Sequence, residues 1–504
     1  MQSSILELAS AMSQFATPAN LLLIFVAGLI GTVVGALPGL GPSAGIALMM
    51  PLTFGMDPVS GLSLLTGVYM GTMYGGRLTA ILINTPGDAP AIITALDGYP
   101  MMQQGRGGLA LGISAVSSFV GGVFGLVMLV FFAPVIAEYA IFLGPPEYFM
   151  LMLLGLSMII VLAGADPLKA LIATLFGVLL STIGSDYVSG NSRFVVMPEL
   201  IEGIDFVAVI IGLFGIGEVL VNIEERVRLN MGKPQFRLGE FIPGARDLRK
   251  VAMPTLRGSA IGTGIGVLPG AGATIATFIS YILEQKLSKT PERFGKGAEE
   301  GLASPEAANN AAVPGSLIPL LTLGIPGSGG TAIMLGALIM FGLNPGPMLM
   351  IQSADIVWGA IAGLILANVF LLGSNVLLIP LFVNALRLIQ RHLSAIVLAF
   401  CLVGAFAINY GTFDIWIAAI FGVIGYLMKK ANYPAGPFIL ALVLTPLAEN
   451  YLRQSIMIGQ GSWGIFFAKP LTAVFSTLVL AVVAFGLLKA PISAAIRRRT
   501  KPAT

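Results

Sequence analysis

The sequence predicts an all-α polytopic membrane protein, and its composition and charge distribution support this prediction. Residues of the set AVILMFWYC make up 56% of the 504-residue chain, whereas Asp, Glu, Lys and Arg make up only 10%, against about 25% in soluble domains. Several long stretches contain no Asp, Glu, Lys or Arg, namely 8–56, 107–137, 258–283, 307–354 and 356–386. A folded soluble surface needs many more charged residues. We therefore expect hydrocarbon, rather than water, to surround most of the chain.

The charge-free runs indicate about ten to twelve membrane segments. A spanning helix needs about 20 apolar residues, and Gly and Pro interrupt the longest runs, so we expect several broken or re-entrant segments. Two stretches are rich in Lys and Arg, and the positive-inside rule places both in the cytoplasm. They divide the chain into a first membrane half (1–223), a basic cytoplasmic linker (224–257), a second membrane half (258–488) and a basic cytoplasmic tail (489–504). The first 20 residues carry only one charge, Glu7, so we expect the N-terminus outside.

The two membrane halves contain an internal repeat. The pattern I-G-T-x-x-G-x-L-P-G-x-G occurs at 30–41 and again at 261–272, and each copy is followed by a second Pro-Gly element, within 84–88 and 324–328. The first copy follows the external N-terminus, whereas the second follows the cytoplasmic linker. The sequence therefore predicts two inverted repeats, an architecture typical of secondary transporters.

The repeated Pro-Gly elements predict interruptions of membrane helices. Pro removes a backbone donor and Gly tolerates positive φ. Interrupted backbone is stable in a bilayer only inside the protein or beside a water-filled cavity, and half-helix N-termini there attract anions. Packing kinks are the alternative interpretation, but four breaks at corresponding positions favour a binding site. The candidate substrate-binding backbone comprises Pro38, Gly39, Gly41, Pro86, Gly87, Pro269, Gly270, Gly272, Pro326 and Gly327.

Polar side chains near these breaks extend the candidate site. Arg77 can form a fork with a substrate carboxylate, unless it instead extends to the membrane surface. Four further residues can contact a carboxylate, namely Asn84, Thr85, Asn309 and Asn310. Three residues are candidate ligands of a coupling ion, namely Asp88, Glu306 and Ser328. Ser304 and Pro305 fit the N-cap and first position of a helix, which would place Glu306 in its first turn.

Taken together, these motifs resemble the large membrane subunit of tripartite tricarboxylate transporters, the TctA family. The resemblance spans nearly the whole chain and depends on the segments 37–41, 74–76, 84–88, 95–100, 268–272, 305–311 and 324–327. It implies a bacterial inner-membrane importer of carboxylates such as citrate, with inverted repeats, re-entrant hairpins and an elevator-like mode. It further implies a small TctB-like membrane subunit, a periplasmic TctC-like binding protein and a coupling Na⁺ or H⁺, with no other cofactor. It assigns no role to Arg77.

Other classes of protein fit the sequence less well. One Cys (Cys401) and one His (His392) exclude an internal disulfide and a histidine-rich zinc or di-metal site. No metalloprotease or P-loop pattern is present, so we expect no enzyme, and a net charge of +3 gives no indication of nucleic-acid binding. An anion channel and a non-transporting membrane scaffold are the alternatives. A scaffold would leave the repeated breaks and the Asn pair unexplained.

Overall fold

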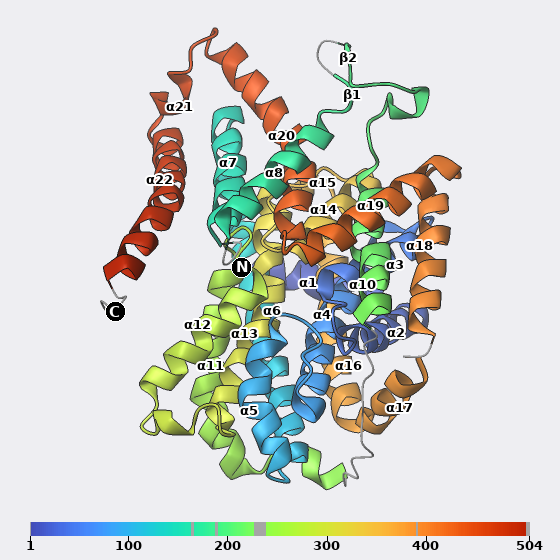
Figure 1. Cartoon of the computed structure of the whole chain (residues 1–504), viewed down its shortest axis with the longest axis vertical. Coiled ribbons are helices and arrows are strands. Elements are labelled where there is room, and N and C mark those ends of the chain that lie inside the picture. The colour runs from blue at the N-terminus through green and yellow to red at the C-terminus, as the bar shows by residue number, and fades with distance from the viewer. Residues whose placement is uncertain (1, 163–165, 187–189, 226–237, 390–391, 500–504) are drawn as a thin grey trace. The chain divides into compact units, whose positions relative to one another are not determined.

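The computed structural model describes residues 2–162, 166–186, 190–225, 238–389 and 392–499. This part of the chain is built almost entirely of helices (Figure 1). Its strands are limited to one antiparallel pair, β1 (Gly184–Ser185) and β2 (Ser192–Arg193). The predicted all-α fold class is therefore confirmed.

Six helical segments are long and apolar enough to cross a membrane, so the protein is polytopic. They are Pro18–Gly35, Gly107–Ala140, Phe206–Glu224, Ala354–Leu377, Thr412–Lys430 and Ala435–Ile458. Other apolar helices are only 10–17 residues long, namely Pro42–Thr53, Pro167–Ser181, Gly329–Met340, Ser394–Asn409 and Pro470–Phe485. Short apolar helices are expected where a membrane segment is broken. The total of ten to twelve segments stays a prediction.

The chain forms two compact units, which do not coincide with the predicted halves. Unit 1 comprises Met1–Glu138 and Asp205–Lys430, and unit 2 comprises Tyr139–Ile204 and Ala431–Thr504. The predicted division at 224–257 follows the sequence repeat instead, and it stays a prediction. Residues 226–237 of that linker lie outside the described residues, and its last part is helical, since a helix begins at Ala245.

Unit 1 contains the repeat and the helices that surround it. Its helices are α1 (Gln2–Phe15), α2 (Pro18–Gly35), α3 (Pro42–Met49), α4 (Pro58–Ile83), α5 (Ala91–Gln103), α6 (Gly107–Ala140, to Glu138), α9 (Phe206–Ile210), α10 (Gly217–Glu225), α11 (Ala245–Gly266), α12 (Gly272–Leu287), α13 (Glu299–Leu323), α14 (Gly329–Met340), α15 (Pro347–Gln352), α16 (Ala354–Leu377), α17 (Ile379–Ile389), α18 (Leu393–Asn409) and α19 (Thr412–Lys430). A π-helical segment, Ile211–Ile216, joins α9 to α10. Short 3₁₀ turns lie at Met50–Thr53, Leu238–Phe241 and Pro291–Arg293.

Unit 2 contains four longer helices and the small strand pair. Its helices are α7 (Pro145–Leu162), α8 (Pro167–Ser181), α20 (Ala435–Ile458), α21 (Ile465–Ala468) and α22 (Pro470–Arg499), with a 3₁₀ turn at Pro198–Leu200. The β1–β2 hairpin is tied to α20 by ion pairs, because Arg193 contacts Glu449 at 2.8 Å and Arg453 contacts Asp186 at 2.7 Å.

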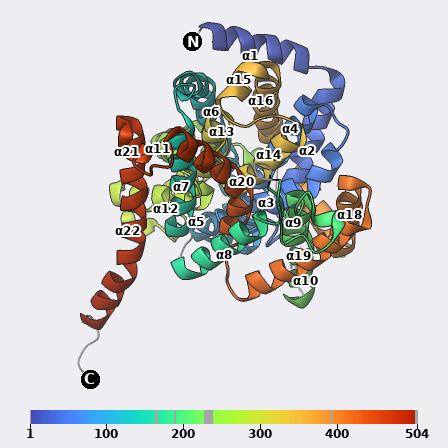
Figure 2. The same ribbon diagram turned by 90° about the horizontal axis from the view of Figure 1, so that it is seen from above.

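The two repeats have matching helices. In the first repeat α2 and α3 flank the L-P-G-x-G break, α4 is the long helix, and α5 and α6 follow; the second repeat has α11, α12, α13, α14 and α16 in the same roles. α2, α3 and α4 lie together in both views, as do α11, α12 and α13 (Figure 1, Figure 2).

Glycines allow the paired helices of each repeat to touch backbone to backbone. A Cβ on Gly266 of α11 would lie only 2.7 Å from the carbonyl oxygen of Ala312 in α13, and a Cβ on Gly35 of α2 would collide with the carbonyl of Thr72 in α4. Such close approach of helices is typical of small residues in membrane proteins. Both repeats therefore depend on the same contact.

A second pair of glycines fixes the alignment of α4 with α13. A Cβ on Gly315 would lie 2.8 Å from the carbonyl oxygen of Thr263, and a Cβ on Gly75 would collide with the carbonyl of Thr32. Gly75 and Gly315 are therefore equivalent. Without gaps, this alignment extends to the Pro-Gly element that follows each helix.

Contacts between the repeats are reciprocal. α13 packs against α5, and α4 packs equivalently against α14. α6 meets α13 where a Cβ on Gly121 would collide with the carbonyl of Ala307, and α16 meets α4 where Gly363 lies against Ser63. Reciprocal contacts are those that a two-fold axis generates. Inverted and parallel repeats both have such an axis, so the inversion stays a prediction.

Candidate substrate and ion site at the helix breaks

The first break of each repeat is the L-P-G-x-G segment. α2 ends at Gly35 and α3 begins at Pro42, while α11 ends at Gly266 and α12 begins at Gly272. Gly39 has a φ of 88°, and the equivalent Gly270 has a φ of 73°. This left-handed backbone is strained for any residue with a Cβ. The predicted helix breaks are therefore confirmed in both repeats.

The second break follows the long helix of each repeat. α4 ends with Asn84 at a φ of 53°, and α13 ends with Gly324 at a φ of 70°. Asn84 is exposed, and the Thr85 hydroxyl donates to the Ile83 carbonyl oxygen at 3.2 Å. Both side chains thus lie at the partially negative end of α4. Their predicted contact with a carboxylate stays a prediction.

The backbone of the two breaks in the first repeat is joined directly. The Gly39 N–H donates to the Gly87 carbonyl oxygen at 3.1 Å. A Cβ on Gly87 would collide with the Gly35 carbonyl, and one on the equivalent Gly327 would collide with the Gly266 carbonyl. The Gly39 N–H therefore has a protein acceptor, and the predicted contacts of the other break residues with substrate stay predictions.

Two equivalent side chains cap the helices that follow the second breaks. Asp88 Oδ1 accepts the Ala91 N–H of α5 at 3.0 Å, and Ser328 Oγ accepts the Thr331 N–H of α14 at 3.2 Å. The sequence prediction selected both capping residues as ion ligands. Ser328 is the N-cap residue of α14, whereas Asp88 lies two residues before Pro90, the N-cap residue of α5. In both cases the side-chain oxygen satisfies an otherwise free backbone donor.

The N-terminal ends of α3 and α14, one from each repeat, meet in unit 1. The Tyr69 hydroxyl and Ser328 Oγ are 2.8 Å apart. A Cβ on Gly329 would lie 2.8 Å from Ser43 Oγ, at the start of α3. Helix N-termini carry unpaired N–H groups and partial positive charge. Their convergence with three hydroxyls produces a site suited to a carboxylate.

The long helix α13 begins earlier than predicted. It starts at Glu299, so Ser304 and Pro305 lie inside the helix and Glu306 does not lie in its first turn. The N-terminus is capped from the other repeat, because Asp97 of α5 accepts the N–H groups of Gly297 and Ala298 at 2.8 and 2.7 Å. The predicted N-cap was wrong because this long-range cap replaces the local signal.

Glu306 and Arg77 form the centre of a buried polar cluster. Both side chains are 0% exposed, and they are close enough to interact electrostatically. Glu306 accepts hydrogen bonds from the hydroxyls of Thr94 and Ser118. Arg77 donates to the Leu111 carbonyl oxygen, Ser114 Oγ and Asn375 Oδ1. Arg77 therefore does not extend to the membrane surface.

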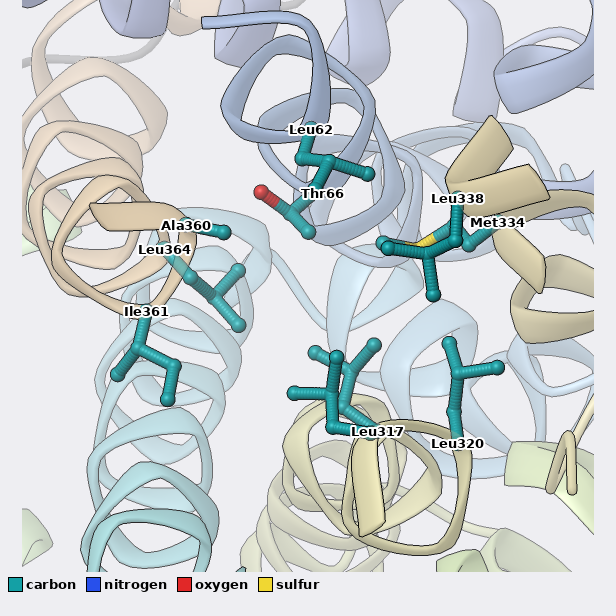
Figure 3. Close-up of a pocket in the computed structure, with 10 residues that line it drawn as sticks. Leu62, Thr66, Leu317, Leu320, Met334, Leu338, Ala360, Ile361 and Leu364 are labelled. Carbon is teal, nitrogen blue, oxygen red and sulfur yellow. The ribbon is translucent and has the colours of Figure 1, made fainter. Parts of the chain in front are cut away.

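The equivalent position in the other repeat interface is apolar. There Thr66 replaces Glu306, Leu317 replaces Arg77 and Met334 replaces Thr94. These three residues line one cavity of about 20 Å³ together with Ala360 and Leu364 of α16, as Figure 3 shows for the side chains of α4, α13, α14 and α16. A cavity with such a lining and volume suits no charged ligand.

Three buried oxygens of the predicted site residues have no hydrogen-bond partner among the described residues. They are Asp88 Oδ2, Asn309 Oδ1 and Asn310 Oδ1. Asp88 is 8% exposed and Asn309 1%. Unpaired buried polar groups are costly and are candidates for a ligand contact.

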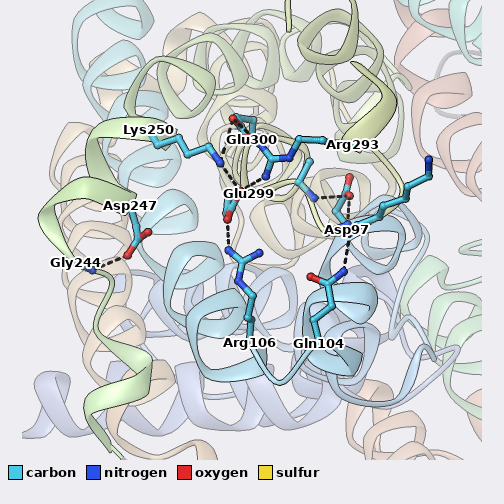
Figure 4. Close-up of polar contacts among 12 residues, drawn as sticks. Asp97, Gln104, Arg106, Gly244, Asp247, Lys250, Arg293, Glu299 and Glu300 are labelled. Carbon is cyan, nitrogen blue, oxygen red and sulfur yellow. Dashed lines mark hydrogen bonds and ion pairs between the residues drawn. The ribbon is translucent and has the colours of Figure 1, made fainter. Parts of the chain in front are cut away.

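An ion cluster lies at the start of α13, outside the six candidate spans. Glu299 accepts from Arg106, from Lys250 at 2.6 Å and from Arg293 at 2.9 Å, and Figure 4 shows these cations around it. Burial raises the pKa of Glu299, but hydrogen bonds from Lys250 and Arg106 outweigh burial and lower this pKa to about 2. Arg106 follows α5, so the cluster joins the two repeats.

The sequence prediction missed several residues of these clusters. Among them are Tyr69, Thr94, Ser118, Asn368 and Asn375. The available signal was a polar residue within an apolar membrane segment. That signal alone does not say which of many Ser, Thr and Asn residues face one another.

Comparisons with known proteins agree with the fold and with the repeat motifs. The model of the tripartite tricarboxylate transporter TctA family matches residues 21–440. A protein of Agrobacterium vitis named "Uncharacterized 52.8 kDa protein in TAR-I ttuC' 3'region" is 41% identical over 473 residues, or 94% of each chain. A second Agrobacterium vitis protein, "Uncharacterized protein in TAR-II ttuC' 3'region", is 40% identical over 227 residues, or 45% of this chain and 94% of that protein. No solved structure matches. The chain therefore belongs to the tripartite tricarboxylate transporter TctA family, whose members are transporter components.

Proposed function

We propose that this chain is the carrier subunit of a secondary transporter that imports di- or tricarboxylates, such as citrate-like anions, in symport with a cation. The observation that carries the proposal is the meeting of the α3 and α14 N-termini from different repeats, beside Tyr69 and Ser328. A site between two repeats is a typical place for substrate in such carriers.

The chemistry of the meeting point suits a carboxylate. The first N–H groups of α3 and α14 have no partner within their helices, and the hydroxyls of Ser43, Tyr69 and Ser328 lie beside them. Hydrogen bonds to an ionised acceptor are about twice as strong as neutral ones. Hydrogen bonds from these N–H and hydroxyl groups can therefore replace the water molecules that hydrate a polycarboxylate.

Coupling to a cation gradient follows from the charge of the substrate. Moving one negative charge inward against a potential of 100 mV costs about 2.3 kcal/mol. For a di- or tricarboxylate this free-energy cost is two or three times as large, unless cations are transported with it. Na⁺ and H⁺ are both candidate coupling ions.

The family implies the assembly that we propose for the protein, and the distribution of Lys and Arg implies the orientation. The chain lies in a bacterial inner membrane with its N-terminus outside and its C-terminus in the cytoplasm. A TctB-like small membrane subunit and a TctC-like periplasmic binding protein complete the system, and the binding protein delivers substrate to the outer face. Access alternates by an elevator-type movement.

Uptake into proteoliposomes tests the proposal. All three components would be reconstituted, and labelled di- and tricarboxylates would be supplied with imposed Na⁺ or pH gradients. We expect accumulation only with a gradient, and Ser43→Ala and Ser328→Ala should each lower uptake by about 10- to 100-fold, the value of one hydrogen bond to a charged group.

Ser181→Ala is the matched control, because the Ser181 hydroxyl donates only to the Val178 carbonyl of its own helix; this variant should retain uptake. Accumulation that requires ATP, or downhill flux independent of any coupling cation, would contradict the proposal. The second result would indicate an anion channel.

A further inference from the structure

We call the second break of each repeat, together with the start of the helix that follows it (84–91 and 324–331), the tip of that repeat. At the tip of the second repeat, hydroxyl groups form hydrogen bonds with the capping side chain. Ser328 Oγ lies 2.8 Å from the Tyr69 hydroxyl and 3.0 Å from Thr331 Oγ1. The neutral Ser328 hydroxyl thus lies beside two further hydroxyls, each of which can donate or accept.

The equivalent tip of the first repeat has a charged cap and has lost these donors. The alignment fixed by Gly75 and Gly315 equates Ser328 with Asp88, Thr331 with Ala91, Ser316 with Gly76 and Tyr69 with Asn309. The second tip therefore has the neutral Ser328 oxygen beside hydroxyl groups. The first tip has the Asp88 carboxylate, and Ala, Gly and Asn residues stand at the equivalent positions of those hydroxyls.

The Asp88 carboxylate retains only one hydrogen bond. Oδ1 accepts the Ala91 N–H, whereas Oδ2 has no partner among the described residues, and neither has Asn309 Oδ1. The two-fold relation places Asn309 opposite Asp88, as Tyr69 lies opposite Ser328. Asp88 also interacts electrostatically with Glu306, one helical turn before Asn309 on α13. From the two-fold relation we infer that these two unpaired acceptor oxygens, one from each repeat, lie near each other.

Gly41, which precedes α3, leaves the neighbouring side of Asp88 uncrowded. A Cβ on Gly41 would meet only the Cβ of Asp88 within 4 Å, at a distance of 3.8 Å. Asp88 itself is 8% exposed.

The charges around Asp88 do not balance. Glu306 interacts electrostatically with Arg77, and three further buried carboxylates, Glu218, Glu284 and Glu299, each contact a Lys or Arg. Asp97 is buried without such a cation, but it accepts three hydrogen bonds. Asp88 has no such cation among the described residues. A buried carboxylate without a counter-charge costs several kcal/mol, which a bound cation would remove.

We propose that Asp88 and Asn309 bind one Na⁺, and that the equivalent second tip at Ser328 and Tyr69 binds none. The ligands are Asp88 Oδ2, Asn309 Oδ1 and carbonyl oxygens of the first repeat's broken backbone, which are the hard oxygen ligands found at interrupted helices. This assignment deepens the proposed symport by naming its cation site. One Na⁺ at one tip leaves the neutral tip to the substrate.

Direct cation binding tests this proposal without substrate or partner subunits. The full chain, purified in lipid nanodiscs, would be melted in increasing NaCl, with choline chloride holding the ionic strength constant. We expect a saturable rise of the melting temperature with Na⁺. Asp88→Asn, which retains the helix cap, should abolish the Na⁺-dependent rise and melt higher than wild type in choline. Asn309→Ala should weaken Na⁺ binding by about 10- to 100-fold.

Ala91→Thr supplies the hydroxyl that the second tip already has at Thr331, and it should also weaken Na⁺ binding. Asp57→Asn is the matched control, because Asp57 caps α4 away from the tip; it should retain the full Na⁺-dependent rise. An unchanged rise in Asp88→Asn, or stabilisation by low pH in place of Na⁺, would overturn the proposal. Na⁺ binding that persists without carboxylate uptake would leave this site intact and contradict the proposed transport instead.

Discussion

The packing of α13 against α5 and α6 can be compared directly with that of α4 against α14 and α16, because the two-fold relation makes the two regions equivalent. The first region buries the Arg77–Glu306 pair with hydroxyl partners. The second has Leu317 and Thr66 at the same positions and encloses an apolar cavity. The two-fold relation thus fixes where helices lie, while each interface carries its own chemistry.

This difference does not follow from the requirements of helix packing. Burying two charges costs desolvation energy that their attraction barely returns, whereas apolar side chains pack at no such cost. The apolar version shows that the helix arrangement does not need charges. Helix packing therefore does not explain the charges of the first interface, and a role of Arg77 and Glu306 in ion or substrate handling stays a proposal.

Substitutions that exchange residues between the two regions test this comparison, and we expect them to cause the largest change in stability. Arg77→Leu, which introduces the residue found at position 317, leaves Glu306 buried without a cation and should cost about 3–5 kcal/mol of stability. The double variant Arg77→Leu/Glu306→Thr copies the apolar region and should recover most of that loss. Thermal unfolding of the purified variants measures both. A double variant as unstable as the single one would show that the two regions are not interchangeable.

The glycine contacts test whether the repeats share one packing scheme. Gly266→Ala places a Cβ against the Ala312 carbonyl and should cost about 3 kcal/mol, and Gly35→Ala should cost a similar amount. Gly264→Ala is the control on the same helix, because nothing lies within 4 Å of its added Cβ; it should leave stability unchanged or raise it slightly. A tolerated Gly35→Ala beside a damaging Gly266→Ala would break the equivalence.

The N-terminal caps of the two long helices, α4 and α13, differ. Removing either cap should lower stability by less than the substitutions above. Asp57 caps α4 from within its own repeat at an exposed position, whereas Asp97 caps α13 from the other repeat and also accepts the Tyr281 hydroxyl at 3.0 Å. Asp97→Ala leaves several buried donors unpaired and should cost about 2–3 kcal/mol, against about 1 kcal/mol for Asp57→Ala. Equal losses of melting temperature would contradict a role for Asp97 in joining the repeats.

We expect the smallest change in stability at the ion cluster at the start of α13, and this change should depend on pH. The pKa of Glu299 is lowered to about 2 from an ordinary value of 4.5, so its stabilising contribution is fully present above pH 4.5 and is lost as the pH falls towards 2. Wild type should therefore melt above Glu299→Gln at pH 7, and the gap should narrow below pH 4.5. A gap that stays constant with pH would exclude the carboxylate charge as its cause.

Several features of this protein follow from local sequence. Apolar runs predict membrane helices because the bilayer requires them, and L-P-G-x-G predicts breaks because Pro lacks a donor and Gly adopts positive φ, as Gly39 and Gly270 do. The same local reasoning failed at Ser304 and Pro305, which have the residue types of a helix start but lie within α13.

The candidate site is largely a matter of tertiary structure. The sequence identified Asp88, Glu306 and Ser328 as polar residues near breaks, yet nothing local shows that Ser328 faces Tyr69 or that Asp97 caps α13. These contacts join residues from different repeats, and only the two-fold packing of whole helices brings them together. Neighbouring residues determine where the backbone is interrupted, because Pro and Gly act on local conformation. The pairing of charged side chains depends instead on which faces of distant helices pack against each other.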